Sequence, residues 1–458
     1  DLSEISAKSA IVIDGETGIG TTNRTSYLLD YDAVKTVTKT VADNDDSFYR
    51  MDKLFGARSK NDGAWHNYRT ISTFSSTCNA GMSKLYGYLG LESSTNAYGC
   101  NGLTEVTDML FSVKYTISNK LLAESDLRSY YTGSDGEFIY RNNYVLPIGY
   151  AINEKSTLHM NLSSSNNGIE NQNILIQTMT GISDIFSFVD EFPTQSECTI
   201  TPSKSGHLYL TVENKTIDYI TVSINGSERS FGCSNLKNNN HIIDVGYVNA
   251  TDRVDVTADS GMNLTAYMLD TDKFIEAYNQ INSESYQVDS FTETDFKGTI
   301  SLSSDKTVLF SIPYDGGWSV YVDGKRVDTF MWKDSLLCAD IPAGEHTIEL
   351  KYMPCNLILG CVLTALSIII LIGIYISGRL IRKGTIKTDN WPVAVRKYLE
   401  LPVTASAADT DTDNLLEESI EESILDDMND FDNLEFSEED NENDENNNLT
   451  DNETKEDL

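Results

Sequence analysis

The stretch Cys355-Asn-Leu-Ile-Leu-Gly-Cys-Val-Leu-Thr-Ala-Leu-Ser-Ile-Ile-Ile-Leu-Ile-Gly-Ile-Tyr-Ile-Ser377 contains no charged side chain. A helix needs roughly 20 apolar residues to cross a hydrocarbon layer about 30 Å thick, and this stretch is long enough to do so. A buried core helix is the alternative interpretation, which the length of the stretch and the arginine and lysine residues beyond it disfavour. We therefore predict one transmembrane helix over residues 355–377.

The charges on the two sides of this stretch orient the predicted helix. Six basic residues follow it: Arg379, Arg382, Lys383, Lys387, Arg396 and Lys397. The segment before it carries Asp340, Glu345 and Glu349 with only Lys351. Because positively charged flanks stay in the cytoplasm, we expect residues 1–353 to be extracellular and residues 379–458 to be cytoplasmic.

The chain has a net charge of −36, and much of this charge lies at its C-terminal end. Residues 401–458 hold 22 acidic residues and one lysine. Nucleic acid is excluded as a partner, because phosphate binding requires clustered lysine and arginine. The tail is too polar to bury the apolar surface that folding needs, so residues 378–458 are predicted to be a basic stretch and a disordered acidic tail. Apolar residues between Leu415 and Phe431 recur at near-helical spacing, which leaves open an amphipathic helix that binds a cytoplasmic partner.

The chain begins at Asp1, and no apolar signal sequence opens it. An outer domain must nevertheless be exported. We therefore expect that membrane-spanning segments precede Asp1 and that this chain is the C-terminal part of a larger protein.

Five cysteines lie outside the predicted helix, and an odd number cannot form a fully paired set. Proximity in the sequence alone suggests the bridges Cys78–Cys100 and Cys198–Cys233. No C-x-x-C pair occurs, which disfavours a zinc ribbon or a thioredoxin-like site.

The periodicity of the outer part predicts an α+β fold. Residues 1–152 are predicted to form an extracellular mixed α/β domain. Its candidate elements are a strand at 9–14, a helix at 31–42 and short strands at 48–51 and 109–115. The residues between the last two strands are rich in Gly, Ser, Asn and Tyr, and we expect them to form loops.

From residue 153 the apolar period becomes two, which is typical of strands. Candidate strands lie at 207–212, 219–224, 242–247, 254–257 and 264–269. Several short strands separated by turn residues predict a β-sandwich-like module over residues 153–270. A helix is predicted to follow at 271–281, with Asp270 or Thr271 as its N-cap.

A second β-module, close to the membrane, is predicted over residues 271–353. Candidate strands lie at 308–312, 318–322, 326–330, 336–340 and 346–352. The dipeptide Asp323-Gly324 between two of them tolerates the positive φ angles of a two-residue hairpin turn. The last strand leads through Pro354 into the predicted transmembrane helix.

Two segments of this module carry a family resemblance. Ile312-Pro-Tyr-Asp-Gly-Gly-Trp-Ser-Val-Tyr-Val-Asp-Gly-Lys-Arg-Val327 is followed by Ile341-Pro-Ala-Gly-Glu-His-Thr-Ile-Glu-Leu-Lys-Tyr-Met-Pro354 and then by one apolar span. This arrangement resembles the C-terminal end of the bacterial YfhO family, whose members are large membrane proteins with a sizeable extracellular domain before the last helix. Shorter upstream pieces resemble the same family: Phe48-Tyr-Arg50, Thr73-Phe-Ser-Ser76, Val113-Lys-Tyr115 and Leu146-Pro-Ile-Gly149. The resemblance covers about residues 1–380.

The resemblance implies a membrane glycosyltransferase of the GT-C kind. Such an enzyme takes sugar from a polyprenyl-phosphate carrier and transfers it to an envelope polymer such as lipoteichoic acid. In that architecture the catalytic acid lies in an early loop between membrane helices that this chain does not include, so no catalytic residue is assigned and this portion alone is expected to be inactive. Its partners would be the membrane and, through the parent protein, the lipid-linked sugar and the envelope glycopolymer.

Aromatic and polar side chains gather within the loop-rich part of the first domain. They are Trp65, His66, Asn67, Tyr68 and Tyr98. Sugar rings present flat C–H faces that stack on aromatic rings, and sugar hydroxyls pair with Asn and His side chains. We predict a glycan-binding groove from these five residues. The alternative is that Trp65 and Tyr68 fill the core of the domain.

No motif for metal or cofactor chemistry stands out. The five histidines lack zinc-ligand spacing, and neither a nucleophile elbow nor a phosphate-binding loop occurs. Asp43-Asn-Asp-Asp46 lacks the central glycine and distal glutamate of a calcium loop, which favours a solvated turn. We therefore predict no metal or cofactor. A non-enzymatic single-pass surface receptor or adhesin remains the alternative function.

Overall fold

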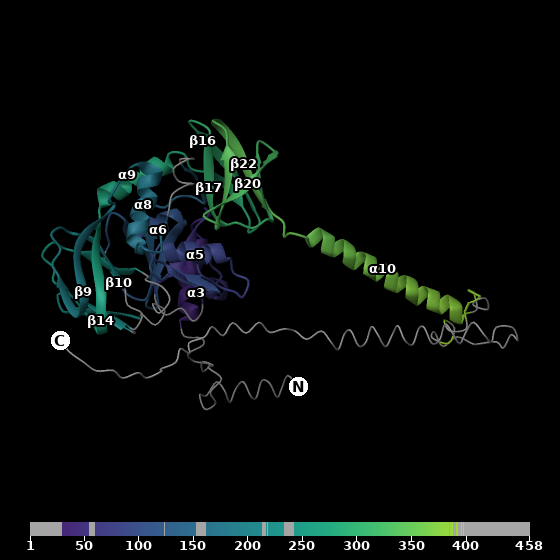
Figure 1. Ribbon diagram of the computed structural model, residues 1–458, viewed down its shortest axis with the longest axis horizontal. Coiled ribbons are helices and arrows are strands. Elements are labelled where there is room, and N and C mark those ends of the chain that lie inside the picture. Colours follow the sequence, from purple (N-terminus) through teal and green to yellow (C-terminus); the bar gives the residue numbers. More distant parts are fainter. Residues whose placement is uncertain are drawn as a thin grey trace, which may run out of the picture. The chain divides into compact units, whose positions relative to one another are not determined.

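The computed structural model describes residues 30–54, 60–122, 124–152, 162–212, 217, 219–232, 242–383, 385–387, 391–392, 395 and 397. The predicted strand at 9–14 and the acidic tail, with its candidate helix, lie outside these residues. The chain divides into two units, residues 1–355 and residues 356–458. The fold is mixed α+β, with several β-sheets and one long apolar helix near the C-terminal end (Figure 1).

A helix packed on a four-stranded sheet opens the described chain. Helix α3 covers Tyr31–Ala42, and the sheet has the order β1-β5-β7-β6. Its strands are β1 (Arg50–Lys53), β5 (Val113–Ser118), β6 (Arg128–Ser134) and β7 (Glu137–Asn142). Val34, Val37 and Val41 recur on one face of α3 and share a core cluster with side chains of the sheet. The helix predicted over 31–42 is thus confirmed.

The segment between β1 and β5 contains more regular structure than we predicted. Its elements are α4 (Asp62–His66), β2 (Thr73–Phe74), α5 (Ala80–Tyr88), β3 (Glu92–Ser94), β4 (Ala97–Gly99) and α6 (Glu105–Leu110). The strand predicted over 109–115 is wrong in its first part, where α6 ends. Thr104 and Thr107 form a reciprocal capping box at the start of α6. Threonine takes the place of the usual glutamate or glutamine there, so the sequence hides this helix start.

A six-stranded sheet follows and builds its own core. The strands are β9 (Phe186–Ile200), β10 (Gly206–Val212), β11 (Tyr219–Ile224), β12 (Ser227–Gly232), β13 (Ile243–Val248) and β14 (Val254–Leu269). The order is β12-β11-β14-β10-β13, and β9 also pairs with β14. Shifts of register between β9 and β14, one of them between Thr257 and Met262, interrupt the long ladder and allow it to bend. The predicted strands at 207–212, 219–224 and 242–247 are confirmed, whereas those at 254–257 and 264–269 are parts of the single strand β14. Strand β9 was missed because it is largely exposed and lacks apolar alternation.

Two helices lie side by side next to this sheet (Figure 1). Helix α8 covers Gly168–Thr180 and begins with a capping box between Asn167 and Glu170. Helix α9 covers Thr271–Asn282, and the Asp270 carboxylate accepts a hydrogen bond from the Lys273 amide. The predicted helix and its N-cap at Asp270 are confirmed, but α8 was missed although its capping box is visible in the sequence.

Two further sheets form a sandwich before the apolar helix. Their orders are β15-β16-β22-β18-β19 and β20-β21-β17-β8. The strands are β8 (Gly149–Ile152), β15 (Gln287–Phe291), β16 (Asp295–Leu302), β17 (Lys306–Pro313), β18 (Trp318–Val322), β19 (Lys325–Val327), β20 (Thr329–Trp332), β21 (Leu336–Ile341) and β22 (Gly344–Tyr352). Buried residues of both sheets belong to one core cluster. Asp323 and Gly324 have φ angles of 50° and 77°, so the predicted hairpin turn is confirmed.

Residues far apart in the sequence join the first sheet to this sandwich. Strand β8, which follows the strands of the first sheet in the sequence, pairs with β17 inside the sandwich. Arg50 reaches from β1 to donate hydrogen bonds to the carbonyl oxygens of Phe111 and Ser311, both at 2.7 Å. Burial lowers the pKa of Arg50, although nearby Asp52 and tyrosine side chains counteract this. The domain boundaries predicted at 152/153 and 270/271 stay predictions.

The second unit begins with one long apolar helix. Helix α10 covers Leu357–Arg382. Its 26 residues reach a mean hydropathy of 2.9 over 18 residues, and none of that window is buried. By length and composition it is able to cross a membrane, and it extends five residues beyond the predicted end at 377.

The described cysteines are free thiols, including Cys78, Cys100 and Cys198. The Cys78 thiol donates to the carbonyl oxygen of Thr95, and the Cys100 thiol donates to that of Lys53. The predicted Cys78–Cys100 bridge is therefore wrong, because the two side chains turn to different partners. Cys233, the predicted partner of Cys198, lies outside the described residues.

Candidate functional site

Three of the five predicted glycan-binding residues lie together beside α3. The Tyr31 ring contacts the Trp65 ring edge-on at 5.2 Å between centroids and stacks on the His66 ring at 5.6 Å. The His66 and Tyr68 rings stack at 6.3 Å. His66 is buried, and Trp65 and Tyr68 are half-buried. Much of this aromatic surface therefore packs within the protein.

The other two predicted residues have different surroundings. Asn67 is exposed and ends α4 with a φ of 59°. Tyr98 is buried in a separate core cluster, where its ring lies 4.7 Å from the Tyr86 ring. The structure thus groups Trp65, His66 and Tyr68 and places Tyr98 elsewhere. The predicted glycan groove stays a prediction.

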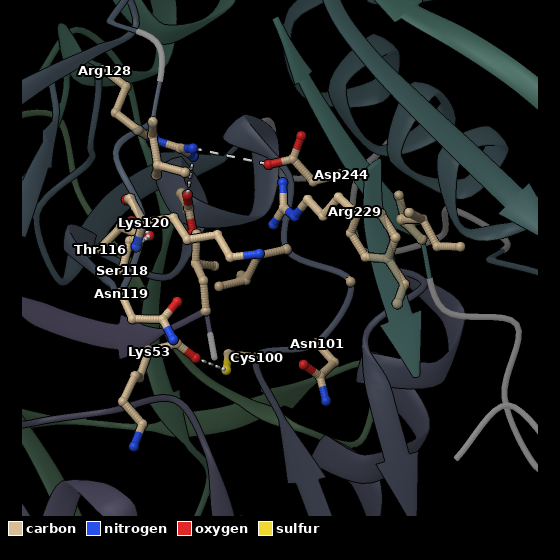
Figure 2. A pocket seen from close by; sticks show the side chains of 18 of the residues that line it. Lys53, Cys100, Asn101, Thr116, Ser118, Asn119, Lys120, Arg128, Arg229 and Asp244 are labelled. Carbon is tan, nitrogen blue, oxygen red and sulfur yellow. Dashed lines mark hydrogen bonds and ion pairs between the residues drawn. The ribbon is translucent and has the colours of Figure 1, made fainter. Parts of the chain in front are cut away.

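A polar cavity of about 480 Å³ lies elsewhere in the first unit, residues 1–355 (Figure 2). The four-stranded sheet, the loop before α6 and strands β12 and β13 of the six-stranded sheet form its walls. Its lining residues are Lys53, Leu54, Cys100, Asn101, Gly102, Leu103, Asp108, Thr116, Ser118, Asn119, Lys120, Leu121, Leu122, Arg128, Arg229, Ser230, Phe231, Ile242, Ile243 and Asp244. None of the five predicted site residues is among them. Cavities of this size commonly bind small molecules.

A buried arginine organises one side of the cavity. Arg128 is 8% exposed. Its Nη2 atom lies 3.1 Å from Glu105 Oε1 and 3.7 Å from Asp108 Oδ2, and its Nη1 atom lies 3.9 Å from Asp244 Oδ2. The Arg128 Nε atom also donates to Asn142 Oδ1 at 3.1 Å. One cation thus connects acids from α6 and β13 to β6, and it offsets part of their charge in a poorly solvated place.

Asp108 is the most perturbed acid in this group. Burial raises the pKa of Asp108 well above its ordinary range, and the charge of Glu105 adds to this while Arg128 opposes it. Its Oδ2 atom accepts a hydrogen bond from Asn142 Nδ2 at 3.0 Å. Its Oδ1 atom is buried and has no hydrogen-bond partner among the described residues. This unsatisfied oxygen atom adds to the free-energy cost of burying the Asp108 carboxyl group.

The rim of the cavity carries two further cations. Lys120 follows β5 and is exposed, and Arg229 on β12 is half-buried. Figure 2 shows both side chains reaching into the same space, with Asp244 close by, whereas Lys53 turns its amine away. The Lys53 amine instead lies 2.8 Å from Asp62. The cavity is therefore lined by two cationic side chains at its rim and by further hydrogen-bonding groups.

The chemistry of this cavity suits binding. Asn101, Asn119, Thr116 and Ser118 supply amides and hydroxyls, and Phe231 supplies an aromatic ring. Amide, carboxyl and guanidinium groups pair with the hydroxyls of a sugar or polyol. The sequence carries no motif for this set, since its members are spread from residue 53 to residue 244.

Hydrogen bonds from neighbouring side chains fix Asp45 in the acidic turn at residues 43–46. Burial raises the pKa of Asp45, but hydrogen bonds from Lys114, Ser47 and Tyr115 outweigh this and lower it to about 2. The Lys114 amine lies 2.6 Å from Asp45 Oδ2, and the Tyr115 hydroxyl lies 2.7 Å from the same atom. Within the described ranges, no three His, Cys, Asp or Glu side chains are grouped so that they could hold a metal ion.

The motif residues between Ile312 and Pro354 act in turns of the sandwich. The Asp315 carboxylate accepts from the Gly317 amide at 2.7 Å. A Cβ atom at Gly317 would lie 2.6 Å from the carbonyl oxygen of Met353, so only glycine fits there. His346 Nδ1 lies 2.8 Å from Asp323 Oδ2. This hydrogen bond lowers the pKa of Asp323 and raises the pKa of His346.

Comparisons with solved structures give only weak similarities. An arabinofuranosyltransferase, AftD, from Mycobacteria is 11% identical with a TM-score of 0.15, and the match covers 34% of this chain and 12% of that one. A cupin 2 conserved barrel domain protein from Leptotrichia buccalis is 11% identical with a TM-score of 0.13, covering 36% of this chain and 80% of that one. A conserved protein of unknown function from Pseudomonas aeruginosa PAO1 is also 11% identical with a TM-score of 0.13, covering 37% and 89%.

Comparison with family models gives a clear result. No curated protein sequence matches this chain. The family model described as bacterial membrane protein YfhO matches residues 3–196 and 189–364. These matches include every residue that lines the cavity and reach into the first part of the apolar stretch. Because they span well over half of the chain, the protein belongs to the YfhO family of bacterial membrane proteins.

Proposed function

We propose that this chain is the C-terminal part of a membrane protein that supports the transfer of sugar from a polyprenyl-phosphate carrier to an envelope polymer such as lipoteichoic acid. In this proposal α10 anchors the chain in the membrane. Residues 1–353 lie outside the cell, and residues 379–458 lie in the cytoplasm. The outer unit binds the acceptor polymer and holds it close to a catalytic site in the membrane portion of the parent protein.

The polar cavity is the observation that supports this proposal most. It holds about 480 Å³ and combines amides, hydroxyls, a buried carboxyl group and an aromatic ring. Such groups suit a hydroxyl-rich ligand better than an apolar one. Membership of a bacterial membrane family and a helix able to span the bilayer support a location at the cell envelope.

The proposed role is positioning. A domain that holds an acceptor beside a reactive carrier converts a bimolecular encounter into an effectively intramolecular one, and this raises the rate without any catalytic group. The cavity is therefore expected to contribute to acceptor use rather than to bond breaking in the donor.

The test uses the bacterium that carries the natural gene. The gene is deleted and then restored either as the natural sequence or with Arg326→Gln, an exposed position on β19 that does not line the cavity. Lipoteichoic acid is extracted, and its sugar content is measured by NMR. We expect the sugar to disappear on deletion and to return with both restored genes.

A deletion strain whose envelope polymers keep their full sugar content would refute the proposal. In that case a surface receptor or adhesin becomes the better interpretation of the outer unit. The coding sequence ahead of Asp1 provides an independent check, because a transferase requires several apolar segments there, whereas a receptor requires only a signal peptide.

A further inference from the structure

The chain that leaves the sandwich stays against a two-glycine turn until just before α10 begins. The Met353 amide donates a hydrogen bond to the carbonyl oxygen of Gly317 at 3.0 Å. A Cβ atom at Gly316 would lie 3.2 Å from the Cys355 sulfur, so Cys355 packs against the same turn. Helix α10 begins at Leu357, and two residues of chain span at most about 8 Å between Cα atoms. The covalent chain therefore keeps Cys355 close to the start of α10.

Aromatic side chains surround this turn and keep part of their surface exposed. Tyr314 and Trp318 flank the turn, and Tyr352 ends β22. The Trp318 and Tyr352 rings lie 5.0 Å apart, and all three aromatic side chains are half-buried. The apolar side chain of Met353 is 53% exposed. Half-buried Trp and Tyr rings with one apolar and one polar end are typical of surfaces that contact lipid headgroups.

The length of α10 places this turn at the level of the headgroups. The uncharged residues 357–378 of α10 span about 33 Å at 1.5 Å per residue. The hydrocarbon core of a bilayer is about 30 Å thick, and headgroups add about 5–8 Å on each side. When this stretch fills the core, Leu357 lies at its edge. Cys355 then lies in the headgroup layer or at its outer boundary, because only two residues separate it from Leu357.

The charged side chains near the turn do not favour anionic lipid. The Lys297 and Lys351 amines lie 3.3 and 2.8 Å from the carboxylate oxygens of Glu349, so both lysines pair with a neighbouring acid. Asp315 adds an exposed carboxylate to the turn itself. A contact with lipid at this place therefore depends on the aromatic and apolar side chains rather than on electrostatic attraction.

We propose that residues 314–318 and 352–353 form a lipid-contact surface in the headgroup layer of the membrane that α10 crosses. The Trp318 and Tyr352 rings lie at the boundary between lipid and water, and the Met353 side chain lies among the lipids. Such a contact fixes the height of the first unit above the bilayer. The inference rests on the part of the proposed function that places α10 across the membrane, and it does not depend on sugar transfer.

The experiment measures quenching of tryptophan fluorescence in the full chain, reconstituted into phosphatidylcholine vesicles. Bromine atoms on the lipids quench tryptophan on contact, and they are placed either close to the headgroup or at the end of the acyl chain. The Trp318 signal is the difference between the natural chain and Trp318→Phe, because Trp65, Trp332 and Trp391 emit as well. We expect bromine close to the headgroup to abolish most of the Trp318 signal and bromine at the chain end to abolish less. Added salt or anionic lipid should not change this quenching.

A second variant tests the surface without relying on Trp318→Phe. Met353→Asp places a charge at an exposed position, and a charged side chain among lipids is unfavourable. We expect it to raise the total emission in vesicles that carry bromine close to the headgroup. Tyr219→Asp is the matched control, since Tyr219 is 64% exposed on β11 of the six-stranded sheet, and it should leave the quenching unchanged. The signal of buried Trp332, obtained with Trp332→Phe, should be equal in all vesicles.

Two results would overturn the inference while leaving the proposed function in place. They are a Trp318 signal that brominated lipids do not quench and a Met353→Asp variant that is quenched as strongly as the natural chain. Extraction of the same vesicles with alkaline carbonate shows whether α10 is inserted, and a chain that is released would contradict the inference and the proposed anchor together. Normal polymer sugar in the deletion strain would overturn only the proposed function, because quenching of Trp318 is measured without any sugar.

Discussion

The Nη2 atom of Arg128 lies 3.1 Å from Oε1 of Glu105, and both side chains are buried. Arg128 begins β6 of the four-stranded sheet, and Glu105 begins α6. The same guanidinium approaches Asp244 on β13 of the six-stranded sheet at 3.9 Å. One arginine therefore links three elements, and the cavity depends on their relative placement.

Replacing this arginine should destabilise the first unit, residues 1–355. Arg128→Gln leaves Glu105, Asp108 and Asp244 without their shared cation, and such a loss costs about 3–5 kcal/mol. Denaturant unfolding of the full chain, followed by tryptophan fluorescence, measures the change in free energy. The exposed Arg326→Gln is the matched control and should shift stability by less than about 0.5 kcal/mol. Equal effects of the two substitutions would show that the buried network contributes little to stability.

The ion pair between Asp45 and Lys114 should make stability depend on acidity. The pKa of Asp45 falls from 3.8 to about 2 on folding. The stabilisation of the folded state by the ionised Asp45 carboxylate is therefore fully present above pH 3.8 and is lost as the pH falls through 2. We expect Asp45→Asn to lower the unfolding free energy by about 1–2 kcal/mol at pH 6, after allowance for partial solvent screening.

The difference in unfolding free energy between the natural chain and Asp45→Asn should shrink steadily between pH 4 and pH 2 when denaturant unfolding is measured across that range. Asp43→Asn provides the control. Asp43 also pairs with a lysine, Lys39 at 2.6 Å, but both side chains are largely exposed. Asp43→Asn should therefore change the unfolding free energy by less than about 0.5 kcal/mol. A difference for Asp45→Asn that persists unchanged at pH 2 would contradict the assignment.

Gly298 should be intolerant of any side chain. It lies in β16, and a Cβ atom there would stand 1.9 Å from the carbonyl oxygen of Gln287 on β15. Gly298→Ala is therefore expected to lower the unfolding free energy by about 2–3 kcal/mol, because the paired strands must separate. Gly261→Ala in β14 is the control, since its nearest contact would be an ordinary 3.7 Å. The same melting temperature for both variants would argue against this close approach.

The charge asymmetry around α10 predicts its orientation. Arg379 and Arg382 lie in the last turn of the helix, and no acidic residue lies in its first turn. With an epitope tag after Leu458, protease added to intact cells should digest the outer unit and spare the tag. Detergent-permeabilised cells serve as the control, because the tag should then be lost. Loss of the tag from intact cells would reverse the proposed orientation.

Elements whose signal is local could be predicted from the sequence. The valine spacing of α3, the Asp270 cap of α9, the Asp323-Gly324 hairpin and the charge-free run of α10 each specify a conformation within a few residues. The family could also be recognised, because its motifs are contiguous. Elements with weak local signals, such as the polar strand β9 and the threonine-capped α6, were missed.

The cavity is different in kind, because no local pattern encodes it. Asp108 and Lys120 reach it from one sheet and its adjoining helix, and Arg229 and Asp244 reach it from another sheet more than 100 residues later. The sequence by itself determined the periodicity of single elements and the long apolar helix, since these depend on neighbours along the chain. Only the tertiary structure decided which charges meet, since that depends on how separate sheets pack against each other.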